Sequence, residues 1–371
     1  MIVSVVDLES VNIIPSIVSI LTAVISAIIA IFSIYLTNRN SKELQKSEFI
    51  YQNKIKELEL THSERLRKLE SELTRERDEE SAIREYEYDA RKRLYQEYEP
   101  LLFQFNELAD NALRRIIALA RESRGGKLEK DISWLSGSGY YFDSTIYRLL
   151  IPFAIFNLMQ KKLTMFDLKL NPFFNQQYLL IKLLYHTFSH DIRLANIEPN
   201  IPEYDPNSVT KVNSNYKKQG IFIGIVDNLT NELIIKEGEN LRIMTFGEFS
   251  NYISDSLKNM QFKAVFEIFK DFHPARCPVL WRILMVQAYV YRAILINYDK
   301  HYKKESIDIK KTLSSISSNW RSKFDWRQGK EREKIADKSV FDDPFNAAEI
   351  YLNKRMEELK LHKGLASSSY I

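Results

Sequence analysis

The sequence predicts an all-α protein made of a single N-terminal transmembrane helix, a long charged helical stalk and a multi-helix cytoplasmic domain. Three observations predict it. An uncharged apolar run covers 13–36, a charged run without Gly or Pro covers 39–99, and amphipathic segments with helical spacing follow. Only ten Gly and ten Pro occur in 371 residues, which indicates few tight turns, and no series of alternating strands is visible.

The apolar run Ile13 to Leu36 is long enough to cross a bilayer. As a helix its residues would span roughly 36 Å, against a hydrocarbon core of about 30 Å. A secretory signal would need a basic region before it, whereas Asp7 and Glu9 precede it. A core helix or an interfacial helix would keep one polar face. We therefore expect a single membrane span, with the lipid bilayer as a partner.

The charges on either side of the span predict its orientation. Residues 1–12 carry no basic side chain, while five follow within about 20 residues of the span, at Arg39, Lys42, Lys46, Lys54 and Lys56. Basic residues stay on the cytoplasmic side. The short N-terminus should face out of the plasma (inner) membrane, and the bulk of the chain should be cytoplasmic.

Residues 39–99 form the expected stalk, with 14 Lys and Arg against 16 Asp and Glu. Apolar residues spaced three and four apart predict a coiled coil over about 44–75, interrupted by a stutter after His62. The seam positions are Tyr51, Ile55, Leu58, His62, Leu66, Leu69 and Leu73. A homo-oligomer through this stalk is the expectation, and a charged helix folded back on the domain is the alternative.

Pro100 is predicted to break or kink the stalk helix, which can resume directly after it, and residues 101–371 should form the helical domain. The proline-rich stretch 197–218 is an expected loop and a candidate sub-domain boundary. The apolar run 279–296 contains Arg282 and Arg292, so a buried core helix is favoured over a second span. Helices are expected at 101–124, 144–163, 172–195, 220–237, 246–258, 261–272, 278–302, 306–320 and 344–363. The expected N-terminal caps are Asp143, Asn171 and the capping box of Thr245 with Glu248, and the expected ends are Gly125–Gly126 for the first helix and Gly364 for the last.

Composition restricts the chemistry. A net charge of +4 from 53 basic and 49 acidic residues argues against a dedicated nucleic-acid binder. The single cysteine, Cys277, excludes an internal disulfide and a cysteine-based zinc site. No phosphate-binding glycine loop or nucleophile elbow occurs, and no cofactor is expected.

Two residue pairs are candidates for a metal site or a catalytic site. His186 and His190 are four apart, which on one helix would place both rings on one face, where they could hold a metal. The further ligands that such a site needs are not evident, and ordinary amphipathic histidines are the alternative.

Arg355 and His362 form the second pair. Their spacing resembles the loose pattern of the helical HEPN ribonucleases, in which an arginine is followed after four to six residues by a histidine. The resemblance implies a charge-stabilising arginine and a proton-transferring histidine. Met356 departs from it, because that family usually has a polar residue there.

The catalytic motifs are few, so binding is favoured over catalysis. We expect a membrane-anchored interaction or effector protein that self-associates and binds a protein or small ligand, for example in bacterial stress or phage defence. A membrane-tethered hydrolase or HEPN-like ribonuclease is the alternative. A pore lined by Ser19, Ser26 and Ser33 is the second alternative.

Overall fold

The computed structural model is mostly helical and divides into two compact units, 1–85 and 86–371. It describes residues 13–129, 133–136, 139–163, 168, 171–201, 204–207, 218–305, 309–315, 318–327 and 344–367. The expected outer segment 1–12 and most of the loop 197–218 lie outside these residues. The described residues on both sides of that loop belong to the second unit.

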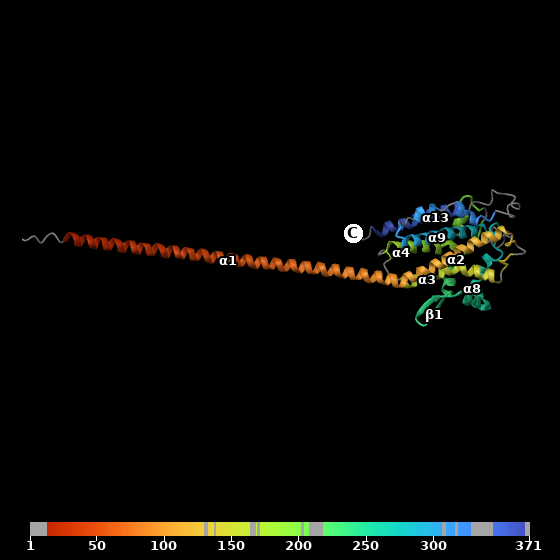
Figure 1. Cartoon of the computed structure of the whole chain (residues 1–371), viewed down its shortest axis with the longest axis horizontal. Coiled ribbons are helices and arrows are strands. Elements are labelled where there is room, and N and C mark those ends of the chain that lie inside the picture. Colours follow the sequence, from red (N-terminus) through yellow and green to blue (C-terminus); the bar gives the residue numbers. More distant parts are fainter. Residues whose placement is uncertain are drawn as a thin grey trace, which may run out of the picture. The chain divides into compact units, whose positions relative to one another are not determined.

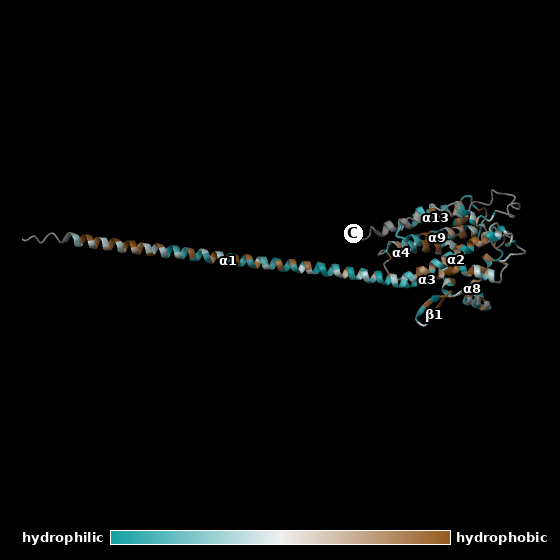
Figure 2. Ribbon diagram, viewed as in Figure 1, coloured by the Kyte–Doolittle hydropathy of each residue, from teal (hydrophilic) through white to brown (hydrophobic). Residues whose placement is uncertain are grey.

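The first unit consists of most of α1, which runs from Ile13 to Arg93 (Figure 1). Its first part is apolar and the part that follows is hydrophilic, as the colours of Figure 2 show. Every side chain from Pro15 to Leu36 is exposed. Two helices of the described chain are long and apolar enough to cross a membrane, namely this N-terminal one and α9 (Pro278–Tyr302).

The expected break at Pro100 takes a different form. Leu94–Tyr98 forms one turn of π-helix, η1, and α2 (Glu99–Arg124) starts directly after it, with Pro100 in its first turn. A proline fits there because the first backbone N–H groups of a helix have no partner within the helix. The predicted end of α2 is confirmed, since Gly125 caps the helix and Gly126 has a φ of 72°.

The second unit is a helical bundle around α9 and α2. α9 contacts α2, α4, α5, α10 and α13, and α2 also contacts α3, so α2 links two groups of helices. The apolar window of α9 is 83% buried, which confirms it as a core helix. The remaining elements are α3 (Tyr140–Leu163), α4 (Pro172–Tyr185), η3 (Thr187–Ser189), α5 (Asp191–Ala195), α6 (Ile223–Glu232), β1 (Ile234–Glu237), β2 (Asn240–Ile243), α7 (Phe246–Ser254), α8 (Ser256–Phe269), α10 (Ile309–Ser314), α11 (Ser318–Arg321), η5 (Ser322–Phe324) and α13 (Pro344–Ser367).

Arg282 is 2% exposed in α9 and is satisfied by backbone carbonyls. It donates to the carbonyls of Leu194 at 2.5 Å and Ile197 at 2.9 Å, and also to that of Pro199. A buried guanidinium needs such acceptors because burial removes its water. The side chain therefore fixes the chain that leaves α5.

Several predicted helix boundaries were wrong. Asp143 does not cap α3, which begins at Tyr140. The helix expected at 220–237 ends at Glu232, and its last residues form strand β1, which pairs antiparallel with β2 in a register that sets Ile234 opposite Ile243. Gly238 turns this hairpin with a φ of 61°. Gly364 does not end α13.

Two predicted caps are confirmed. The Asn171 side chain accepts from the backbone N–H groups of Phe173 and Phe174 at the start of α4. Thr245 and Glu248 form the expected capping box of α7. Asp255 then starts a separate helix, α8, by accepting from Leu257, so α7 is shorter than predicted.

Candidate histidine–arginine site

The two histidines of the first pair lie on a turn, and their predicted placement on one continuous helix was wrong. α4 ends at Tyr185, His186 is its C-cap, and His190 directly precedes α5. The hydroxyls interrupt the helix: Thr187 Oγ1 donates to the Leu184 carbonyl at 2.7 Å, and Ser189 Oγ donates to the His186 carbonyl at 2.9 Å.

This turn is held against the core. Gln287 in α9 donates to Thr187 Oγ1 at 3.0 Å, and Phe188 is fully buried. On the other side, Ile221 N donates to the Phe188 carbonyl at 2.8 Å. The histidines on either side of Phe188 are therefore attached to a rigid part of the fold.

The imidazole rings of His186 and His190 are nearly parallel, with centroids 6.0 Å apart. Tyr351 of α13 lies 2.5 Å from His190, measured from its hydroxyl to Nδ1. Burial raises the pKa of Tyr351 to about 12, so at neutral pH the phenol keeps its proton and can donate it to that nitrogen. Nδ1 then accepts, and the other ring nitrogen of His190 carries the hydrogen.

Arg355 lies one turn beyond Tyr351 on α13, and its positive charge lowers the pKa of both histidines. Burial lowers the pKa of His190 to about 4, and the positive charge of Arg355 contributes after burial. The same two causes lower the pKa of His186. Both imidazoles are consequently neutral at pH 7, as a proton acceptor must be.

The Arg355 guanidinium is only partly neutralised. Its Nη1 pairs with Glu358, which also lies 3.8 Å from Arg193 Nη1 on α5. Burial would raise the pKa of Glu358, yet the two arginines hold it below its ordinary value. The Nε of Arg355 is buried without a hydrogen-bond partner. One carboxylate thus faces two guanidinium groups, which leaves net positive charge beside the neutral imidazoles.

The structure brings together residues from both predicted pairs. Arg355, predicted as a pair with His362, lies close enough to His186 and His190 for its charge to lower the pKa of both. The backbone of His362 belongs to α13, while its side chain lies outside the described residues. Tyr351 was missed by sequence reasoning. Its position four residues before Arg355, on the same helical face, is the signal that could have found it.

The geometry gives no support for a metal at His186 and His190. Among the described residues, no group of three or more His, Cys, Asp and Glu side chains could hold a metal ion. The contacts described for these two rings are with each other, with aromatic rings and with the Tyr351 hydroxyl. The site is better suited to binding an anion than a cation.

A second polar pair, Ser123 and His273, does not form a nucleophilic site. Ser123 Oγ lies 2.9 Å from His273 Nε2, and the Ala275 N–H donates to His273 Nδ1 at 3.1 Å. Nδ1 is therefore an acceptor, so Nε2 carries the hydrogen and donates to the serine. This tautomer cannot take a proton from Ser123, and both side chains are buried.

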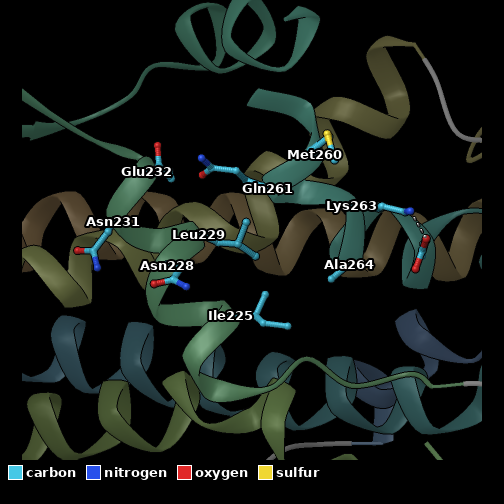
Figure 3. A pocket seen from close by; sticks show the side chains of 10 residues that line it. Ile225, Asn228, Leu229, Asn231, Glu232, Met260, Gln261, Lys263 and Ala264 are labelled. Atoms are coloured by element: carbon cyan, nitrogen blue, oxygen red, sulfur yellow. Dashed lines mark ion pairs between the residues drawn. The ribbon is translucent and has the colours of Figure 1, made fainter. Parts of the chain in front are cut away.

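A groove of about 630 Å³ lies between α6 and α8 (Figure 3). Ile225, Leu229 and Ala264 contribute apolar side chains to its wall, and two of its polar side chains bond to residues outside it. Glu232 accepts from the Tyr252 hydroxyl at 2.6 Å, and Asn231 accepts from Lys161 at 2.8 Å. Lys263 and Glu267 pair with each other at 3.9 Å, so each of the three charged side chains that line this groove already has a partner.

No protein-family model, curated protein or solved structure matches this chain, so the site rests on its own geometry.

Proposed function

We propose that this is a single-span membrane protein that self-associates through α1 and presents its helical domain as an effector module on the cytoplasmic face. One observation carries the proposal. All large apolar side chains from Ile17 to Leu36 are exposed, between 42% and 67%, whereas the second unit buries its apolar residues in a core. A continuous exposed apolar surface of this length is favourable when lipid, and not water, surrounds it.

The seam of the stalk supports self-association. Its seven positions repeat as 4-3-4 and 4-3-4, two units of 11 residues joined at His62. This period is about 3.67 residues per turn, which suits a straight or slightly right-handed coiled coil. Leu58, Leu66 and Leu69 on this seam are 63%, 48% and 55% exposed in the single chain. A second copy of the helix would cover them, and each leucine that becomes fully buried would stabilise the dimer by about 1.5–3 kcal/mol.

Disulfide crosslinking in native membranes tests this interface. In a Cys277→Ser background, Leu69→Cys places a thiol on the seam, and Ser71→Cys places one about 200° away on the same helix. Copper-phenanthroline oxidation should give a covalent dimer with Leu69→Cys at several times the yield with Ser71→Cys. Equal yields, or no dimer at either position, would refute self-association through this seam.

A second candidate function is metal-independent phosphodiester cleavage of RNA, and the convergence of Arg355 with His186 and His190 favours it. His186 has no hydrogen bond to either ring nitrogen among the described contacts, so it is the imidazole open to a 2′-hydroxyl proton. Attack of the 2′-oxygen on phosphorus would break the bond from phosphorus to the 5′-oxygen, and the protonated His186 would return its proton to that leaving oxygen. Arg355 would stabilise the negative charge that develops on the phosphate oxygens. Tyr351 would hold His190 in place beside them.

Purified full-length protein, incubated with single-stranded RNA in EDTA, tests the second candidate. His186→Gln and Arg355→Gln should each lower the cleavage rate by about 100-fold or more. His62→Gln in the stalk is the matched control and should cleave at the wild-type rate. Absence of cleavage by the wild type, or full activity in both site variants, would reject the enzymatic function and leave the anchored interaction protein standing.

A further inference from the structure

A second polar pocket, of about 270 Å³, lies between α2, α3 and the start of α7, and shares no residue with the histidine–arginine site. α2 contributes Asn111, and α3 contributes Ser144 and Arg148. The rings of Tyr140, Tyr147 and Phe246 form the rest of its polar and aromatic wall. Small-molecule sites start at about 300 Å³, so this pocket can take most of one small organic molecule, with the rest of the ligand outside it.

A buried arginine, Arg115, contacts one of the residues that line this pocket. Arg115 of α2 is 5% exposed, and its Nη2 donates to Ser144 Oγ at 3.0 Å. Its guanidinium carbon lies 4.5 Å from the ring centre of Tyr141, and its Nε is buried without a hydrogen-bond partner. Within the described part of the chain, no carboxylate forms an ion pair with Arg115.

Arg148, on the pocket wall, is a second cation near the first. Burial above all lowers the pKa of Arg115, and the charge of Arg148 acts in the same direction. The described residues provide no acidic partner for Arg148 either. A buried guanidinium beside a second, half-buried one and without a carboxylate is costly, and a bound anion reduces that cost.

The aromatic wall indicates that the anion carries a planar group. Phe246 lies with its ring centre 5.5 Å from those of both Tyr140 and Tyr147. Tyr140 is 68% exposed, so one ring of this set is free to stack on a ligand. Asn111 donates its side-chain N–H to the Glu107 carbonyl at 3.0 Å, which leaves its amide oxygen to accept from an amino group.

We propose that this pocket binds a mononucleotide whose base carries an exocyclic amine. The phosphate lies at Arg148, with the positive charge of Arg115 behind it, while the Ser144 hydroxyl, which donates to the Tyr141 carbonyl at 3.2 Å, holds Arg115 in place. The base lies against Tyr140 and presents its amine to Asn111. This goes beyond the membrane-anchored role and does not depend on it.

Titration of the full-length protein in detergent with AMP, adenosine and inorganic phosphate tests the proposal. Calorimetry should show AMP binding at least ten times more tightly than either fragment. Arg148→Gln should weaken AMP binding at least tenfold. Arg114→Gln is the matched control, because that arginine is 73% exposed and pairs with Asp110, and it should bind AMP like the wild type.

A second variant keeps the test decisive if Arg148→Gln does not fold. Asn111→Ala lies on the exposed side of α2 and should weaken AMP several-fold while leaving phosphate binding unchanged. Without ligand, a folded Arg148→Gln protein should melt at or above the wild-type temperature, because a repulsion is removed. No AMP binding at millimolar concentration, or wild-type affinity in both pocket variants, would overturn the assignment.

Discussion

Gly220→Ala should destabilise the helical domain because a Cβ at this position has no space. An added Cβ would lie 2.4 Å from Cγ, and 2.6 Å from both Cβ and Oδ2, of Asp191. Asp191 is 8% exposed and accepts from the Tyr204 hydroxyl at 2.6 Å. Because the clash reaches the Cβ of Asp191, rotation of the carboxylate alone cannot relieve it, and the start of α5 must move.

The size of the effect follows from two costs. Overpacking in a core costs about 1–3 kcal/mol. Weakening a hydrogen bond to a charged, buried carboxylate costs about 1.5–3 kcal/mol. Since the two share one displacement and are not fully additive, we expect Gly220→Ala to lower the free energy of unfolding by about 2–4 kcal/mol.

Urea unfolding followed by tryptophan fluorescence measures this loss. All four tryptophans, at 134, 281, 320 and 326, lie in the second unit and report on its unfolding. Gly224→Ala is the matched control, because nothing lies within 4 Å of its added Cβ in the first turn of α6. If Gly220→Ala unfolds within about 0.5 kcal/mol of this control, the close packing of Gly220 on Asp191 is refuted.

Three further predictions concern the same domain. Arg282→Met should lower the free energy of unfolding by about 2–4 kcal/mol, because one buried and two partly buried carbonyls lose their donor; a loss below 1 kcal/mol in urea unfolding would contradict this. Asn171→Ala should cost about 1 kcal/mol through the lost cap of α4, and Asn171→Asp, which can still accept, should restore most of it in thermal melts. Burial lowers the pKa of His190 from 6.5 to about 4, so the unfolded state binds a proton at this residue more tightly than the folded state does. The stability that the folded state gains from a neutral His190 is therefore present above pH 6.5 and is lost as the pH falls towards 4. Allowing for its partial exposure, unfolding should become easier by about 1–2 kcal/mol between pH 7 and pH 4.5, and His190→Asn should flatten this slope; an unchanged slope would show that His190 is not the titrating group.

Local signals in the sequence predicted much of the helical fold. Caps such as Asn171 and the Thr245–Glu248 box act through atoms only a few residues apart, so their sequence pattern determines where a helix starts. The two arginines of 279–296 correctly favoured a core helix, because a charge can be satisfied by carbonyls of a protein and not by lipid. The membrane span and the coiled coil remain predictions.

The errors arose where side chains or distant segments override periodicity. The hydroxyls of Thr187 and Ser189 bond to backbone carbonyls and end a helix whose apolar spacing continues. Strand β1 exists because β2 pairs with it, and a pattern of four residues does not reveal that partner.

From the sequence, residues of the histidine–arginine site were predicted only as members of two separate pairs, and not as one site. Spacing along the chain related His186 to His190 and Arg355 to His362. The packing of α13 on α5 brings Arg355 and Tyr351 to the histidines from about 160 residues away, and no local pattern contains that information.

Alkaline carbonate extraction of membranes from cells that produce the full-length chain tests the central claim most directly. If lipid surrounds Ile13 to Leu36, the protein stays in the membrane pellet and floats with lipid in a density gradient, while Ile25→Arg combined with Ile28→Arg shifts it to the supernatant, since each charge at the centre of the span costs about 2.5–3.5 kcal/mol. Release of the wild-type protein by carbonate would contradict the account.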